Sequence, residues 1–103
     1  MSAPRHVVSV QSNHGGNDLD GVPVEDWREE RKVFARIIPL VGREYIASRQ
    51  ANLETTHKIE TEFFSGASAV QRLICGERVF HVESVINSME RNRRLIWMTR
   101  ETL

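Results

Sequence analysis

The sequence contains a single cysteine, Cys75, so no disulfide can form within the chain, and nothing indicates an oxidising compartment. It also lacks an apolar run near the roughly 20 residues that a membrane-spanning helix requires, so we expect no contact with a membrane. Residues 1–16 hold one arginine and no continuous apolar stretch, and we therefore expect no secretory signal there. These absences indicate a protein that stays in the cytoplasm, or goes wherever a cytoplasmically made assembly ends up.

The chain has no excess of charge of either sign, since 14 basic residues balance 14 acidic ones. This balance argues against a general nucleic-acid-binding protein, which carries a clear basic excess. The length of 103 residues excludes a multidomain enzyme, and 40% apolar with 27% charged residues is typical of a globular domain. We expect one domain over residues 1–103, with a modest core that can depend on neighbouring subunits.

Neither an internal repeat nor a strand–helix–strand alternation is visible, which argues against a parallel sheet. Short segments rich in Val, Ile and Phe alternate instead with turn-forming residues, as antiparallel strands do. The expected strands are residues 5–12, 24–40, 54–64, 70–75, 78–86 and 94–100. The predicted fold class is mostly β: a small antiparallel β-barrel or sandwich of about six strands with one short helix or long loop.

The alternation of apolar residues within these strands also predicts the core. The predicted core includes Val8, Val10, Ile37, Ile59, Leu73, Phe80, Val82 and Leu95. Val85 breaks the alternation, which predicts a bulge near Ser84. Within 24–40, apolar residues on both faces predict that the C-terminal half is buried on two sides, whereas residues 24–32 form either a helical turn or the exposed start of a strand.

Three segments between the strands have a different composition. Residues 13–23 hold three of the six glycines, which predicts a long, polar, flexible loop. Residues 41–53 favour helix but are too short for a stable lone helix, so we expect a docked helix or mobile loop that contributes to assembly. Residues 88–93 form a polar connection, which we expect Ile86 and Leu95 to anchor in the core.

A segment at residues 18–21, DLDG, resembles part of a calcium-binding loop. If Gly21 is the sixth position of such a loop, the first and twelfth positions are Gly16 and Trp27. Both positions require acidic ligands, which glycine and tryptophan cannot supply. We therefore interpret the segment as a solvated loop.

The remaining residues that commonly carry chemistry are not grouped. The histidines and the cysteine show no pair at the close spacing of a zinc site; they are His6, His14, His57, His81 and Cys75. Cys75 precedes a hairpin glycine in an apolar strand, so we interpret it as a small buried filler. No nucleophile, base and oxyanion donor come together, and we expect no catalysis, no metal and no cofactor.

Two basic features remain, namely the segment ERNRR at residues 90–94 and the pair Arg43 and Arg49. One interpretation is a surface patch of salt bridges, each contributing about 0–1 kcal/mol. The other is a charged interface or a contact with a phosphate backbone. The residues alone leave both interpretations open.

An ordered series of short motifs covers about residues 5–101. Its most specific segments are PLVGREYIASRQ at residues 39–50 and ERNRRL at residues 90–95. The other members are, in order, Trp27, residues 33–37, His57, Ile59, residues 72–74, Gly76, residues 80–82 and residues 84–87. With these motifs the chain resembles the family of small phage head–tail joining proteins, also called head-closure or stopper proteins. It departs from that family at Glu62 and Phe63, where members often carry a basic–aromatic pair.

The resemblance implies a structural virion protein, made in the host cytoplasm, that joins the phage head to the tail. It implies a ring below the portal that extends or closes the DNA channel after packaging. The implied partners are a portal or adaptor protein ring, the tail or next connector protein, and other copies of this chain. DNA would pass through the channel without tight binding, which suits a chain of neutral charge.

We hypothesise that two segments form the assembly interface. Its residues are Gly42, Arg43, Glu44, Gln50, Glu90, Arg91, Asn92 and Arg93. Arg91 and Arg93 either brace the barrel within one subunit or bridge two subunits, with acidic partners near residues 25–30 of a neighbouring copy.

The alternative function is a small, non-catalytic β-barrel module that contacts nucleic acid or another protein. A module for single-stranded nucleic acid needs aromatic residues interleaved with Lys or Arg on one face of a sheet. Trp97, near Arg94 and Arg100 in the sequence, is the feature that suggests such a face.

Overall fold

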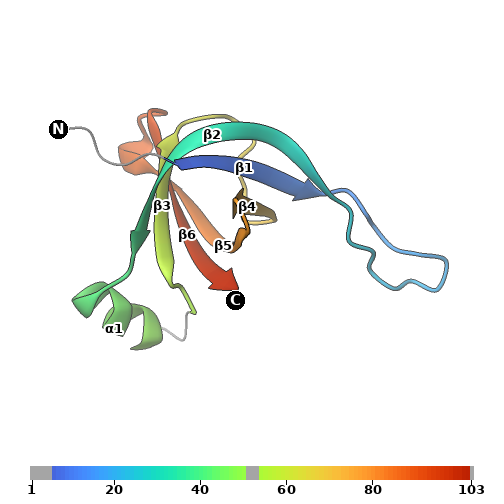
Figure 1. Ribbon diagram of the computed structural model, residues 1–103, viewed down its shortest axis with the longest axis horizontal. Helices are drawn as coiled ribbons and strands as arrows, with labels where there is room; N and C mark the ends of the chain where they lie inside the picture. The colour runs from blue at the N-terminus through green and yellow to red at the C-terminus, as the bar shows by residue number, and fades with distance from the viewer. Residues whose placement is uncertain (1–5, 51–53, 103) are drawn as a thin grey trace.

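The structure is a computed structural model that describes residues 6–50 and 54–102 (Figure 1). Six antiparallel strands close into a barrel in the order β1-β2-β3-β6-β5-β4. The strands are β1 (His6–Asn13), β2 (Trp27–Pro39), β3 (His57–Glu62), β4 (Gln71–Cys75), β5 (Arg78–Asn87) and β6 (Arg94–Thr102). The helices are α1 (Gly42–Gln50) and the 3-10 turn η1 (Ser88–Glu90). The predicted mostly β fold with about six strands and one short helix is confirmed.

The hairpin of β1 and β2 extends well beyond the barrel and ends in the tip loop, residues 14–26 (Figure 1). This projection gives the chain a longest dimension of 51 Å against 31 and 29 Å for the other two. Strand β2 begins at Trp27, so the first three residues of the strand expected over 24–40 belong to the tip loop. The rest of the charged segment 24–32 is an exposed strand rather than a helical turn.

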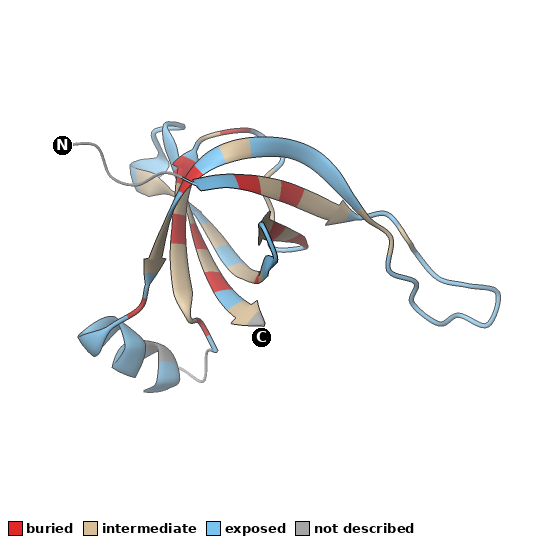
Figure 2. Cartoon of the chain, viewed as in Figure 1, coloured by how far each residue is buried: buried red, intermediate tan, exposed pale blue. Residues whose placement is uncertain are grey.

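The core lies inside the barrel, where buried side chains of all six strands meet (Figure 2). Six of the eight predicted core residues are buried, while Ile37 and Val82 are half-buried and pack against the same cluster. The prediction omitted Ala35, Phe64 and Trp97, which are also buried. The largest of these, Trp97, has 0% of its surface exposed and fills the barrel.

The burial of Trp97 corrects its interpretation as a stacking surface for nucleic acid. Trp97 shares the inward face of β6 with buried Leu95 and Thr99, whereas Arg94 and Arg100 point to solvent. Side chains that are an odd number of residues apart in a strand lie on opposite faces of the sheet. The tryptophan and the two arginines therefore cannot form one binding surface.

The bulge near Ser84 is confirmed, because the register between β5 and β6 shifts between Val82 and Ser84. The shift changes which residues of β5 face inward, so Ile86 is 47% exposed and does not anchor the following connection in the core. Phe34 is also exposed, so β2 is not buried on both faces. Cys75 is half-buried against the core rather than fully buried.

Two of the predicted structural segments extend to residues outside the described part of the chain. The first expected strand includes residue 5, and the segment 41–53 includes residues 51–53. The described part of that segment contains helix α1.

Candidate assembly interface

Helix α1 lies at one end of the barrel and leaves its described side chains exposed to solvent (Figures 1 and 2). The chain enters it from β2 through buried Leu40, whose backbone N–H donates to the Thr56 carbonyl at 3.0 Å. Gly42 then adopts a φ of +58°, which an L side chain rarely tolerates, and turns the chain into the helix. Four predicted interface residues, Gly42, Arg43, Glu44 and Gln50, thus lie together on one exposed element.

Among the described residues, one ion pair links α1 to the barrel. Glu44 Oε1 lies 3.6 Å from Lys58 Nζ on β3, and the Arg49 guanidinium lies 4.8 Å from the Tyr45 ring within the helix itself. Tyr45 and Ile46 are 45% and 55% exposed, so they offer apolar surface to solvent rather than to the core. The helix is therefore available for contact with another protein.

The connection from β5 to β6 holds the other predicted interface residues in a tight, exposed turn. Met89, Glu90 and Asn92 all have φ near +54°, a conformation that costs roughly 1–2 kcal/mol for each residue other than glycine. Two hydrogen bonds hold this conformation: Asn87 Nδ2 donates to Asn92 Oδ1 at 2.7 Å, and the Asn92 backbone N–H donates to Asn87 Oδ1 at 3.1 Å.

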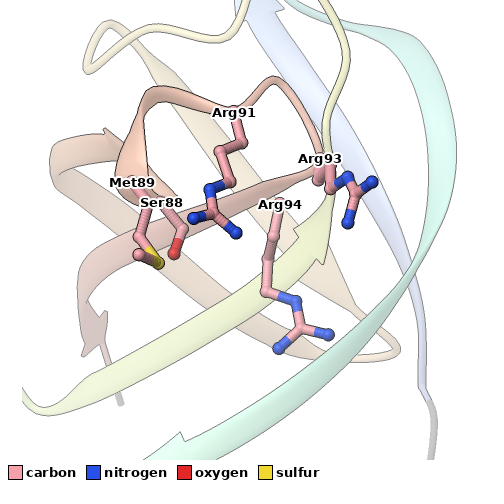
Figure 3. Close-up of a pocket in the computed structure, with 5 residues that line it drawn as sticks. All are labelled: Ser88, Met89, Arg91, Arg93 and Arg94. Atoms are coloured by element: carbon pink, nitrogen blue, oxygen red, sulfur yellow. The ribbon is translucent and has the colours of Figure 1, made fainter.

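This turn and the start of β6 surround an open pocket of about 230 Å³, the arginine pocket, lined by Ser88, Met89, Arg91, Arg93 and Arg94 (Figure 3). Arg94 Nη1 lies 3.5 Å from Glu60 Oε2. The side chains of Arg91 and Arg93 make no ion pair and no hydrogen bond to any residue that the structure describes. Within the described chain they therefore do not brace the barrel, and their donors are free for an external acceptor.

The tip loop has the opposite charge. It contains four acidic residues and no Lys or Arg. Asp18 Oδ1 accepts hydrogen bonds from the backbone N–H groups of Asp20 and Val22, both at 2.9 Å, and so shapes the turn at the tip. Gly15 lies so close to the opposite side of the loop that a Cβ would overlap the Val24 carbonyl oxygen. Leu19 is fully exposed at the tip.

A polar cluster that the sequence did not reveal joins β3, β5 and β6. The Arg78 guanidinium donates to both carboxylate oxygens of Glu101, at 2.7 and 3.1 Å, which lowers the pKa of Glu101. His57 Nε2 lies 3.8 Å from Glu101 Oε1, and its ring meets the Phe80 ring edge-on at 5.4 Å. Burial lowers the pKa of His57, Glu101 opposes this shift, and Arg78 adds to it.

We expect the fold to lose stability as the pH falls through the ordinary His57 pKa of 6.5. Because the folded state has the lower pKa, it binds fewer protons than the unfolded chain in that range, and acid favours unfolding. The melting temperature should therefore be lower at pH 5.5 than at pH 7.5, and His57→Gln should reduce that difference. His81→Gln, on β5, is the matched control. An unchanged difference in His57→Gln would contradict the prediction.

The described residues contain no group of three or more His, Cys, Asp or Glu side chains that could hold a metal ion. None of the described helices is both long enough and apolar enough to cross a membrane.

Comparison with known proteins places these surfaces in context. A family model described as "Phage head completion protein" matches residues 2–102. The fold is shared with protein SF1141 from Shigella flexneri 2a, at 16% sequence identity and a TM-score of 0.69, over 93% of this chain and 90% of that one. It is also shared with a chain of the virion of a native gene transfer agent particle, at 17% identity and a TM-score of 0.66, over 93% of each chain. No match was found among curated protein sequences.

Proposed function

Because the chain belongs to the phage head completion protein family, we propose that it is a structural virion protein that joins the phage head to the tail. In this proposal, copies of the chain form a ring below the portal. The ring extends or closes the DNA channel after packaging. The observation that carries the proposal is the family match over residues 2–102.

The architecture supports a role as one subunit of a larger assembly. The six strands form a closed barrel, and three exposed features project from it: helix α1, the tip loop and the turn that carries the arginine pocket. A ring subunit needs separate surfaces for its two neighbours and for the proteins above and below it. The proposed partners are a portal or adaptor ring on one side and the tail or next connector protein on the other.

The interface residues predicted from the sequence suit this role in two groups. Gly42, Arg43, Glu44 and Gln50 lie on α1, which we assign to contacts with the next protein or with the channel. Residues 90–93 lie in the turn between β5 and β6, which we assign to contacts between subunits.

We further propose that the protein acts without catalysis and lets DNA pass without binding it tightly. The balanced charge of the chain supports weak contact with DNA, since tight binding to phosphates needs a basic excess. The alternative of a nucleic-acid-binding barrel loses the feature that suggested it, because Trp97 is inside the core.

Imaging of labelled particles tests the proposed function. Virions of the phage that encodes this chain are stained with a gold-labelled antibody against the protein, and particles made without the protein are the control. We expect gold at the single vertex that joins head and tail, and none on control particles. Gold spread over the capsid surface, or no gold on intact virions, would refute the proposed function.

A further inference from the structure

The tip loop and the arginine pocket are complementary in both charge and apolar character. We infer that the tip loop of one copy binds the arginine pocket of the neighbouring copy. The inference rests on the proposed function, because it requires several copies of the chain in one assembly. It adds the contact that joins them.

The tip loop presents an apolar anchor between acidic groups. Leu19 is fully exposed and stands between Asp18 and Asp20. The carboxylates of Asp20 and Glu25 make no ion pair and no hydrogen bond to any described residue. Asp26, by contrast, is already paired with Arg28 at 2.8 Å. The loop thus offers one free carboxylate, that of Asp20, directly beside an exposed leucine, and a second, that of Glu25, on its returning arm.

The pocket presents the matching groups. Arg91 and Arg93 supply guanidinium donors that no described residue uses, and Arg94 adds a third positive charge (Figure 3). Guanidinium groups bind carboxylates through two parallel hydrogen bonds, which gives geometry as well as strength. Met89, at 74% exposed, is a flexible apolar side chain in the same pocket that suits contact with a leucine.

The two surfaces cannot meet within one chain. In Figure 1 the tip loop and the turn η1, drawn in orange, lie on opposite sides of the barrel along the longest axis, which measures 51 Å. A contact between them must therefore join two copies through two different surfaces. Such a head-to-tail contact repeats from copy to copy and produces a ring when the rotation closes.

A DNA phosphate is the other anion that the arginines could bind. The acidic loop of a neighbour is favoured because Met89 lines the same pocket as the arginines, and an apolar side chain there has no partner in a phosphate backbone. Leu19 among the acids supplies that partner. The pocket and the loop therefore match at both kinds of group.

A charge exchange in assembled particles tests the contact. Arg91→Glu with Arg93→Glu, or Asp20→Lys with Glu25→Lys, should each reduce incorporation of the protein into particles at least about tenfold, since close charge pairs at protein interfaces are commonly worth that much. The variant with all four changes restores opposite charges and should recover incorporation. Lys32→Glu with Arg36→Glu changes net charge as the first pair does, on exposed positions of β2, and should leave incorporation unchanged.

A cross-link then locates the contact directly. Particles carrying both Leu19→Cys and Met89→Cys, treated with a short bismaleimide, should give a ladder of covalent oligomers. Particles with only one of the two introduced cysteines should give no ladder. Because these particles also contain the native Cys75, they show whether that cysteine contributes to cross-linking.

The outcomes separate this inference from the proposed function. Gold at the head–tail vertex without a ladder, or failure of the fourfold variant to recover incorporation, overturns the contact and leaves the proposed function standing. Loss of binding to duplex DNA in Arg91→Glu with Arg93→Glu, without recovery in the fourfold variant, overturns the contact in favour of a phosphate site. A missing vertex label refutes the proposed function whatever the cross-link shows.

Discussion

Replacing Trp97 with alanine is expected to lower the free energy of unfolding by about 3–5 kcal/mol, the usual cost of truncating a buried aromatic residue. Trp97 is fully buried, lies 5.9 Å from the Phe64 ring between centroids, and donates from Nε1 to Thr61 Oγ1 at 3.0 Å. A small domain is stable by only about 5–15 kcal/mol in total, so this single change removes a large share. Much of the variant should be unfolded or aggregated on expression.

Urea unfolding followed by circular dichroism measures this effect. Trp97→Phe keeps most of the ring volume and should lose clearly less stability than Trp97→Ala. Thr61→Val should cost about 1–3 kcal/mol, because it leaves the buried indole N–H without its acceptor. Trp27→Ala is the matched control. Trp27 is half-buried under the Arg72 guanidinium and lies outside the core, at the first residue of β2 next to the tip loop. Equal losses in Trp97→Ala and Trp27→Ala would show that the stability does not depend on this core.

The alternation of apolar and polar residues was sufficient to predict the strands and most of the core. The one large error concerned Trp97, although the sequence held the information to avoid it. Leu95 was assigned to the core, and Trp97 lies two residues further along the same strand, so strand geometry places both on one face. Arg94 and Arg100 are an odd number of residues from Trp97 and must face the other way. The error came from grouping residues by proximity in sequence rather than by face.

Other features could not be predicted because they depend on contacts between distant segments. Ile86 faces solvent because the bulge after Val82 shifts the register, and the sequence locates a bulge without showing how the face changes after it. Arg78 and Glu101 are 23 residues apart and meet only because β5 and β6 pair. The arginine pocket depends on non-glycine residues at positive φ, which composition does not indicate. The sequence does not show that the donors of Arg91 and Arg93 lack partners among the described residues, because this depends on where the acidic residues lie in the fold.

Helix α1 was predicted as a segment that serves assembly rather than folding. Because it is exposed, its removal should have little effect on stability. Its described side chains are exposed, and Glu44 makes a contact to β3 at 3.6 Å from Lys58. A surface ion pair of this kind contributes about 0–1 kcal/mol. Replacing residues 43–50 by a short Gly/Ser turn should therefore change the free energy of unfolding by less than about 1 kcal/mol, since the barrel core lies elsewhere.

The same replacement should reduce infectious assembly to the level of particles that lack the protein. Exposed Tyr45 and Ile46 offer apolar surface that a neighbouring protein can bury, and Arg43 and Glu44 are exposed on the same helix. A second variant separates side chains from backbone: alanine at residues 43–50 keeps a helix but removes its groups, and should fail as the turn variant does. Urea unfolding and plaque titre are measured for both. Normal titre with the turn variant would remove α1 from the assembly surface, and an unfolded monomer would instead assign it to the fold.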